Sequence, residues 1–248
     1  MVEIRRPVQT TQTSIKILET LIEKNSSTIK ELAEELEIAE STTHRHLTTL
    51  RNEDLVVKIN DQYRAGLHLY YLGNKERKQR DLLSAGREVV ENLSVQTRKT
   101  SWLYSLENDM CAPIYGSSNQ TSKNHYSVIG QLTPLHSNAG GKAILSVLPD
   151  DRIDEILRDN RLQSSTEHTI TSETRLRDEI EIIRDRGYAI SEGEAVSGVN
   201  AIAAPIAVAD EIGAVGFHSF DGAKHDDLSV FSEDVLEKAA EISISLQS

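Results

Sequence analysis

The sequence is poor in cysteine and in long apolar runs, and these scarcities exclude several classes of protein. Cys111 is the single cysteine among 248 residues. Intrachain disulfides and a zinc site made of several cysteines are therefore excluded. No apolar run approaches the roughly 20 residues of a membrane span, and none follows basic residues near the start of the sequence. We expect a soluble, cytoplasmic chain, long enough for two domains with separate cores.

Basic residues are also scarce, because 27 Lys and Arg face 39 Asp and Glu, giving a formal net charge of −12. The imbalance is small in residues 1–66, with 9 basic and 11 acidic residues, and larger in residues 67–248, with 18 and 28. Such a chain does not wrap nucleic acid as a whole. A small module with a local basic face can still bind phosphates.

A short segment with helical spacing carries no acidic residue: "STTHRHLTTLRN", residues 41–52. We interpret it as a helix capped by Ser41. One stripe of this helix has two leucines facing the core and consists of Thr43, Leu47, Leu50 and Asp54. The opposite face carries Thr42, Arg45 and Thr49.

The elements around this helix have the order of a winged helix-turn-helix. Apolar spacing predicts a helix over residues 13–24, and Thr28 and Glu31 have the spacing of a capping box that opens a second helix through Leu36. After the acid-free helix, two β-prone runs flank Asn60-Asp61, a hairpin turn signal. The third helix of such a module enters the DNA major groove, where an acidic side chain would face phosphates. We therefore favour DNA binding over the alternative, a solvated helix that lacks acids by chance.

The predicted DNA contacts come from three places. They are Ser41, Thr42, Thr43, His44, Arg45 and Thr49 in the third helix, Lys58 and Arg64 in the wing, and Arg5 and Arg6 before the first helix. Arg45 is expected to read a base edge, and the others to contact phosphates, thymine methyls or the minor groove. For Arg5 and Arg6 a flexible, solvated tail is an equal alternative.

The remainder predicts a charged helix followed by a mixed domain. Residues 74–98 have a narrow apolar stripe, which fits either pairing with another subunit or packing on the second domain of the same chain. Residues 99–248 alternate strand-like and helix-like stretches with antiparallel hairpins, and Gly187 is in position to end one helix. This pattern predicts an α+β sheet domain with a small-ligand pocket beside the sheet.

Four stretches in this order resemble the IclR-type transcriptional regulators: "STTHRHLTTL", "YRAGLHLYYLG", "PLHSNAGGKAILSVLP" and "RGYAISEGEAVSGVNAIAAPI". The resemblance implies a winged helix-turn-helix over residues 1–73, a linker helix over 74–98 and a GAF-like effector-binding domain over 99–248. It also implies a homodimer or a dimer of dimers that binds a double-stranded DNA operator.

The resemblance places an effector pocket at Asn138, Ala139, Gly140, Ser191, Ala201, and His218 or Ser219. Backbone N–H groups of Ala139 and Gly140 are expected to hold the carboxylate of a small anionic molecule. Ser191 stands where the family often has an acid, and Ala201 where it often has a cysteine, so the identity of the effector does not carry over.

Other chemistries fit poorly. "NAGGKA" fails as a phosphate loop, because His136 and Ala143 stand where Gly and Ser or Thr are required. No G-x-S-x-G motif occurs, Cys111 reads as a buried strand residue, and Lys142 as a structural or solvated one. His44 and His46 point about 200° apart on a helix and do not share an ion. We expect no enzyme, cofactor or metal site. The alternative function is a DNA-binding scaffold whose second domain binds a protein; an exposed apolar patch beside Ala139 would favour it, and an enclosed polar cavity would favour a metabolite.

Overall fold

The computed structural model describes residues 7–118, 128–159, 162–220 and 227–247. The chain divides into two compact units, Met1–Arg77 and Lys78–Ser248. Arg5 and Arg6 lie outside the described residues. Within the described ranges, no helix is both long and apolar enough to cross a bilayer.

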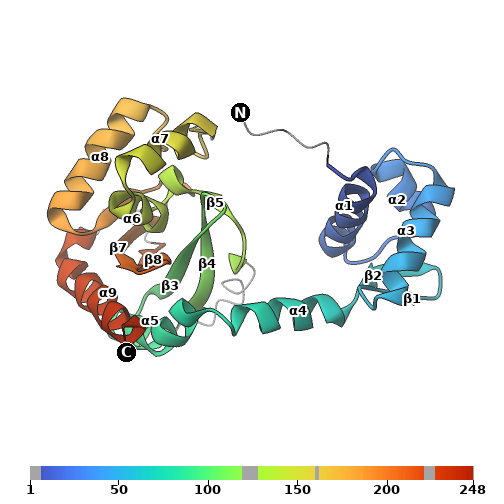
Figure 1. Cartoon of the computed structure of the whole chain (residues 1–248), viewed down its shortest axis with the longest axis horizontal. Helices are drawn as coiled ribbons and strands as arrows, with labels where there is room; N and C mark the ends of the chain where they lie inside the picture. Colours follow the sequence, from blue (N-terminus) through green and yellow to red (C-terminus); the bar gives the residue numbers. More distant parts are fainter. Residues whose placement is uncertain (1–6, 119–127, 160–161, 221–226, 248) are drawn as a thin grey trace. The chain divides into compact units, whose positions relative to one another are not determined.

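The first unit is a winged helix-turn-helix followed by one more helix (Figure 1). Its elements are α1 (Gln9–Lys24), α2 (Ile29–Glu35), α3 (Glu40–Asn52), β1 (Val56–Ile59), β2 (Gln62–Ala65) and α4 (Leu67–Arg77). The wing is an antiparallel hairpin with Ile59 paired to Gln62 across the predicted turn. Its core consists of Ile17, Leu21, Leu32, Leu47, Leu50, Val56 and Tyr63.

Local signals set the ends of these helices, with one exception. The predicted capping box is present: the Thr28 side chain accepts from the Glu31 N–H, and the Glu31 side chain accepts from the Thr28 N–H. The predicted cap at Ser41 is wrong, because α3 begins at Glu40 and its N-cap is Ala39, two residues before Ser41. Asp54 follows the end of α3 and adopts a positive φ of 59°, so it does not extend the buried stripe.

The predicted single helix over residues 74–98 is two helices, α4 and α5 (Asp81–Thr97). The break has a packing cause, because the apolar stripe of α5 is buried within the second unit, whereas α4 has no buried residue. Arg80, at the N-cap position of α5, has an extended backbone and an ion pair to Glu107 at 2.7 Å. Of the two alternatives for this stripe, packing within the same chain is correct.

The second unit is built on a six-stranded antiparallel sheet with the order β5-β4-β3-β8-β7-β6. The strands are β3 (Thr100–Glu107), β4 (Met110–Ser117), β5 (Thr133–Pro134), β6 (Ala189–Glu192), β7 (Asn200–Val208) and β8 (Glu211–Ser219). The helices are the short η2 (Leu135–Ser137), α6 (Ala139–Val147), α7 (Asp150–Asp159), α8 (Glu173–Arg186), the short η3 (Leu228–Phe231) and α9 (Ser232–Leu246). The predicted strand and helix stretches are thus present, with Gly187 in the left-handed conformation after α8.

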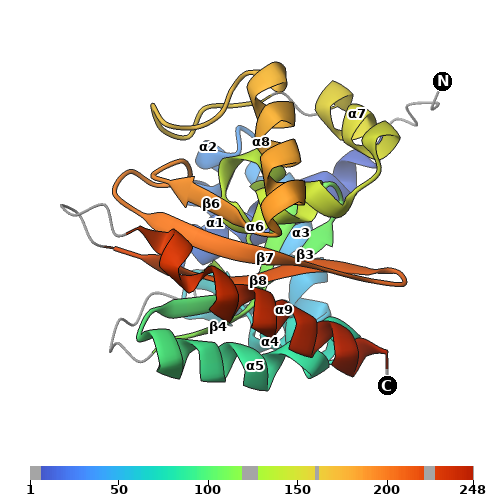
Figure 2. The same ribbon diagram turned by 90° about the vertical axis from the view of Figure 1, so that its left-hand side faces the viewer.

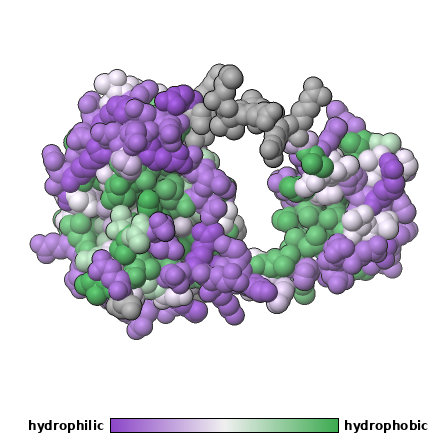
Figure 3. Space-filling model, in the orientation of Figure 1, coloured by the Kyte–Doolittle hydropathy of each residue, from purple (hydrophilic) through white to green (hydrophobic). Residues whose placement is uncertain are grey.

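Helices cover both faces of the sheet (Figures 1 and 2). Helices α5 and α9 pack on one face, with a core that includes Leu103, Val215 and Phe217. Helix α6 packs on the other face, with α8 outside it, around a core that includes Cys111, Ala143 and Ala203. The outer surface over α7 and α8 is largely hydrophilic (Figure 3). The two faces therefore have separate cores, and only one of them carries α6.

Candidate DNA-binding and effector sites

The face of α3 directed to solvent is polar and free of acidic side chains after Glu40. Its exposed residues are Ser41, His44, Arg45, Thr48, Thr49, Arg51 and Asn52, and Thr42 is half-buried. The guanidinium of Arg45 makes no ion pair within the described part of the chain, so its donors are available for a base edge or a phosphate. Thr48 and Thr49 donate their hydroxyls to carbonyls one turn earlier, at 2.8 and 3.2 Å, which leaves their methyl groups toward solvent.

Thr43 is a wrong prediction as a DNA contact. Its side chain is fully buried and donates to the carbonyl of Ala39 at 3.2 Å. Thr48 was missed, although the helical spacing places it one turn from Arg45 on the exposed face. His46 lies at the edge of the core, where its Nδ1 is 2.8 Å from the Ser14 hydroxyl of α1. Among the described residues, no group of three or more His, Cys, Asp or Glu side chains could hold a metal ion.

The wing carries two cations that differ in their interactions within the chain. Lys58 has a carboxylate partner, Asp61, at 3.8 Å, and its Nζ lies 5.3 Å from the centre of the Tyr63 ring. Arg64 is exposed on the opposite strand, in register with Val57. A phosphate at the wing would meet Arg64 directly, whereas Lys58 would first exchange Asp61 for the phosphate.

The predicted effector residues from three strands lie in one row. Ser191 of β6 pairs with Ala201 of β7, which pairs with His218 of β8. Ala189 and Ala203 pack in the core under α6, so their neighbours at i+2 and i−2, Ser191 and Ala201, face the same helix. The row therefore lies on the α6 face of the sheet.

Strand alternation separates the two candidates on β8. Phe217 packs in the core on the α5 and α9 face, so His218 faces α6 and Ser219 faces away from it. The Ser219 hydroxyl accepts a hydrogen bond from Lys99 Nζ at 2.8 Å. His218 is thus the β8 residue on the side of Ala139, and the prediction of Ser219 as a contact in the same pocket is wrong.

The start of α6 is held by a capping residue. Asn138 is the N-cap, and its Oδ1 accepts from the Gly141 N–H at 2.8 Å and from the Cys111 thiol at 3.6 Å. Its amide nitrogen donates to the Thr133 hydroxyl at 3.1 Å. Both polar ends of the side chain are engaged, so Asn138 positions the loop. The N–H groups of Ala139 and Gly140 open the helix and have no acceptor within it, which favours an anion at this end.

Burial makes Cys111 unreactive. The thiol is fully buried in β4, as predicted, and burial raises its pKa to about 12. A thiol that stays protonated at neutral pH is a poor nucleophile. Cys111 therefore contributes packing and one hydrogen bond to the cap of α6.

Close packing requires the two glycines of α6. A Cβ at Gly140 would lie 2.6 Å from Cδ2 of Tyr104, and one at Gly141 would lie 2.2 Å from the Leu135 carbonyl oxygen. Both positions exclude a side chain even without a ligand. A valine at Gly140 would displace the Tyr104 ring, so a loss of ligand response in such a variant would not distinguish a blocked effector site from disturbed packing.

Two aromatic residues of β3 were missed in the sequence. Trp102 and Tyr104 alternate with Leu103, which packs on the opposite face, so both lie on the α6 side. Trp102 Nε1 donates to His218 Nδ1 at 2.9 Å. Because Nδ1 accepts, the neutral ring carries its proton on Nε2. The alternation in "SWLYSL" was the signal that could have placed these rings on the pocket face.

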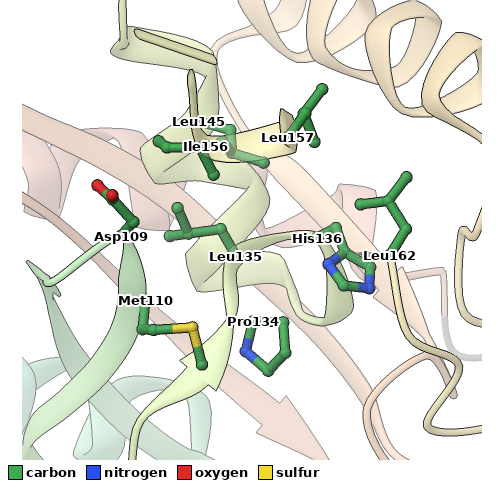
Figure 4. Close-up of a pocket in the computed structure, with 9 residues that line it drawn as sticks. All are labelled: Asp109, Met110, Pro134, Leu135, His136, Leu145, Ile156, Leu157 and Leu162. Atoms are coloured by element: carbon green, nitrogen blue, oxygen red, sulfur yellow. The ribbon is translucent and has the colours of Figure 1, made fainter. Parts of the chain in front are cut away.

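A small apolar hollow lies beside the start of α6 (Figure 4). It is lined by Asp109, Met110, Pro134, Leu135, His136, Leu145, Ile156, Leu157 and Leu162. His136 Nε2 is 3.0 Å from the Gln163 carbonyl oxygen, and burial lowers the His136 pKa. None of the predicted effector residues lines this hollow. It is neither the enclosed polar cavity nor the exposed apolar patch that would separate a metabolite from a protein partner.

Comparisons with known proteins agree with this architecture. Residues 75–243 match the family described as "Bacterial transcriptional regulator IclR C-terminal", and residues 10–57 match "Winged helix-turn-helix DNA-binding". The probable HTH-type transcriptional regulator ArcR of Halobacterium salinarum is 30% identical over 205 residues, covering 81% of this chain and 78% of the relative.

Solved structures show the same fold along nearly the whole chain. The IclR protein of Thermotoga maritima superposes with a TM-score of 0.80 at 24% identity, covering 97% of this chain and 99% of that one. An IclR homologue from Microbacterium hydrocarbonoxydans, in complex with 4-hydroxybenzoate, has a TM-score of 0.77 at 19% identity, with coverages of 96% and 99%. The winged helix, the sheet domain and these matches together show that the chain belongs to the IclR family of DNA-binding transcriptional regulators.

Proposed function

We propose that this chain regulates transcription by binding operator DNA through α3 and the wing, and that a small carboxylate bound at the start of α6 changes this binding. One observation supports this location of the effector site. The first N–H groups of α6 lie on the same side of the sheet as the row Ser191, Ala201 and His218. Free N–H groups and the positive end of a helix favour a carboxylate.

Two observations support a carboxylate rather than a neutral ligand. Helix α6 has no acidic residue in its first turn, so no side-chain carboxylate of that turn occupies the anion-binding end. The Microbacterium relative was crystallised with 4-hydroxybenzoate, a small aromatic carboxylate. Trp102 adds an aromatic wall beside His218.

The test couples ligand binding to DNA binding. Purified protein is screened by thermal shift with small carboxylates, including pyruvate and 4-hydroxybenzoate, and hits are titrated into the protein bound to a fluorescent operator fragment. A ligand that raises the melting temperature by mass action and changes the operator Kd supports the proposal. If no carboxylate does either, and a protein partner is needed to change operator binding, the scaffold function replaces it.

A matched pair of variants localises the site. Ala201→Leu adds bulk in the row that faces α6, whereas Ala207→Leu adds the same bulk on the same face of β7 at an exposed position. We expect Ala201→Leu to abolish the ligand response and leave operator binding by the ligand-free protein unchanged. A normal response in Ala201→Leu, or the same loss in Ala207→Leu, would move the effector elsewhere.

We also propose a homodimer, supported by the surface of α4. Leu67, Tyr70 and Tyr71 are 84%, 73% and 56% exposed, and hydrophobic residues are visible on this unit in Figure 3. Large apolar side chains grouped on one helix are typical of a protein interface. Tyr70→Glu is expected to lower the mass measured by light scattering and to weaken binding to a two-half-site operator more than to a single half-site. An unchanged mass would exclude α4 from the interface.

A further inference from the structure

A lysine is buried in the helix that starts at the proposed effector site. Lys142 of α6 is 1% exposed, and its Nζ lies 2.7 Å from Glu194 Oε1 and 3.4 Å from Glu179 Oε1. Arg186 lies 3.5 Å from the same oxygen of Glu179, on α8. Two cations and two carboxylates thus form a neutral cluster that joins α6, α8 and the segment after β6.

Glu194 belongs to the connection between the two strands that carry Ser191 and Ala201. The hydroxyls of Thr166 and Thr169 donate to its carbonyl at 3.3 and 2.6 Å, so both the backbone and the side chain of Glu194 are held. Beyond Glu194 the connection is free of such anchors: residues 195–198 are exposed.

Glycines flank this connection on both sides. Gly193 and Gly198 have φ values of 68° and 78°, a region that other residues rarely adopt. The Gly193 N–H donates to the Val199 carbonyl at 2.9 Å, closing residues 193–199 into a loop. We call residues 193–199 the β6–β7 loop; its one buried side-chain anchor is Glu194.

The buried ion pair between Lys142 and Glu194 is not explained by folding stability alone. Burying two charges costs several kcal/mol each in desolvation, and a shape-matched neutral pair is often as stable or more so. The second carboxylate oxygen, Glu194 Oε2, is buried and has no hydrogen-bond partner among the described residues. Burial raises the pKa of Glu194 despite Lys142, and Glu179 and Glu192 raise it further. The pair fixes a position at an energetic cost.

We propose that Lys142 and Glu194 are positioning residues whose ion pair latches the β6–β7 loop to α6. The latch holds the strand ends that bear Ser191 and Ala201 at a fixed distance from the N terminus of α6. The role in ligand binding rests on the proposed function; the latch itself does not. Lys142 is three residues from Ala139, so one ion pair fixes the distance between the helix that offers the N–H groups and the strands that face it.

The latch is tested first without any ligand, by hydrogen–deuterium exchange on the full chain. The double variant Lys142→Met/Glu194→Gln removes both charges with side chains of similar shape, which avoids leaving one charge buried alone. We expect the hydrogen-bonded amides of this loop, those of Gly193 and Val199, to exchange about tenfold faster or more, with those of α9 unchanged. Arg177→Gln is the control, because Arg177 pairs with Asp154 and Glu173 on the outer surface and does not contact the loop.

The second measurement is the affinity of the best carboxylate found among pyruvate and 4-hydroxybenzoate. The double variant is expected to bind about tenfold more weakly or worse, and Lys142→Arg, which keeps the charge, to recover part of the loss. Unchanged exchange in the β6–β7 loop of the double variant would overturn the latch. Faster exchange with unchanged affinity would overturn its role in positioning the site. If wild-type protein binds no carboxylate of the screen, these two included, the proposed function fails at this site, while the exchange experiment still decides the latch.

Discussion

The two units of this chain hold their functional charges in opposite ways. In the winged helix, Arg45 is exposed and makes no ion pair within the described residues, so it is free to meet a partner. In the sheet domain, Lys142 is 1% exposed and is bound by two carboxylates of its own chain. A surface that recognises DNA needs free donors, whereas the proposed ligand site, made of backbone N–H groups, would need its surroundings fixed. This difference explains why DNA binding can be inferred from exposed side chains of α3, whereas the proposed ligand site has to be inferred from the packing around α6.

The strongest expected effect tests the buried half of this comparison. Lys142→Met alone leaves Glu194 buried without its closest cation, and we expect the unfolding free energy of the second unit to fall by about 3–5 kcal/mol. Trp102 is the single tryptophan and is buried in β3, so its fluorescence in a urea titration reports this unit alone.

Exposed cations provide the contrast to Lys142. Arg177→Met removes ion pairs whose members are more than a third exposed, and the expected loss is below about 1 kcal/mol. Equal losses in Lys142→Met and Arg177→Met would show that burial does not distinguish the two ion pairs.

The exposed half is tested by Arg45→Ala. An arginine that bridges two acceptors on a guanine contributes about 1–3 kcal/mol, and its loss relaxes the preference at one base pair. Binding to an operator library, measured by fluorescence anisotropy or sequencing, checks this. Thr43→Ser is the control within α3, because Thr43 is buried and hydrogen-bonded inside the helix. A sequence preference in Arg45→Ala identical to that of wild type would remove Arg45 from base reading.

The wing is expected to contribute a smaller, sequence-independent term. Each phosphate contact adds about 0.9 to the slope of log K against log salt, so replacing both Lys58 and Arg64 by Ala should flatten it by roughly two units. Lys58 already has Asp61 as a partner, so Arg64→Ala alone should account for more than half of the change. Salt titrations of the wild type, Arg64→Ala and the double variant on one operator measure this. A double variant with the wild-type slope would place the wing away from DNA.

Local sequence signals predicted local structure well. The capping box at Thr28 and Glu31, the hairpin turn at Asn60-Asp61, where Asn60 has a positive φ of 55°, and Gly187 after α8 all depend on neighbours within a few residues. Each signal acts through a backbone conformation that few other residues adopt or a hydrogen bond that few others make. The order of the elements followed from these signals.

Long-range packing explains the rest. We predicted a DNA contact for Thr43, although Thr43 lies on the same stripe of the helix as Leu47 and Leu50. Those two leucines belong to the core, and the Thr43 side chain is buried with them. The single helix over residues 74–98 was wrong because burial of α5, not its periodicity, decides where it begins. The partner of Lys142 is 52 residues away, beyond any spacing rule.

The smallest expected effect is the pH dependence of the latch. The pKa of Glu194 is raised in the folded chain, mainly by burial, so the fold favours the protonated form. The corresponding stability is fully present below the pKa of the unfolded chain, near the ordinary value of 4.5, and is lost as pH rises through the higher folded pKa. Glu194→Gln cannot ionise, so its stability relative to wild type should increase from acidic to neutral pH.

The charged groups that face Glu194 are Lys142, Glu179 and Glu192, and all three remain in the variant. Urea titrations of both proteins between about pH 4 and pH 8, followed by Trp102 fluorescence, measure the difference. Exposed carboxylates of the second unit with lowered pKa values, such as Asp227, change stability in the opposite direction but are common to both proteins and cancel. A difference that stays constant with pH, or that falls as pH rises, would show that Glu194 ionises in the fold as easily as in the unfolded chain.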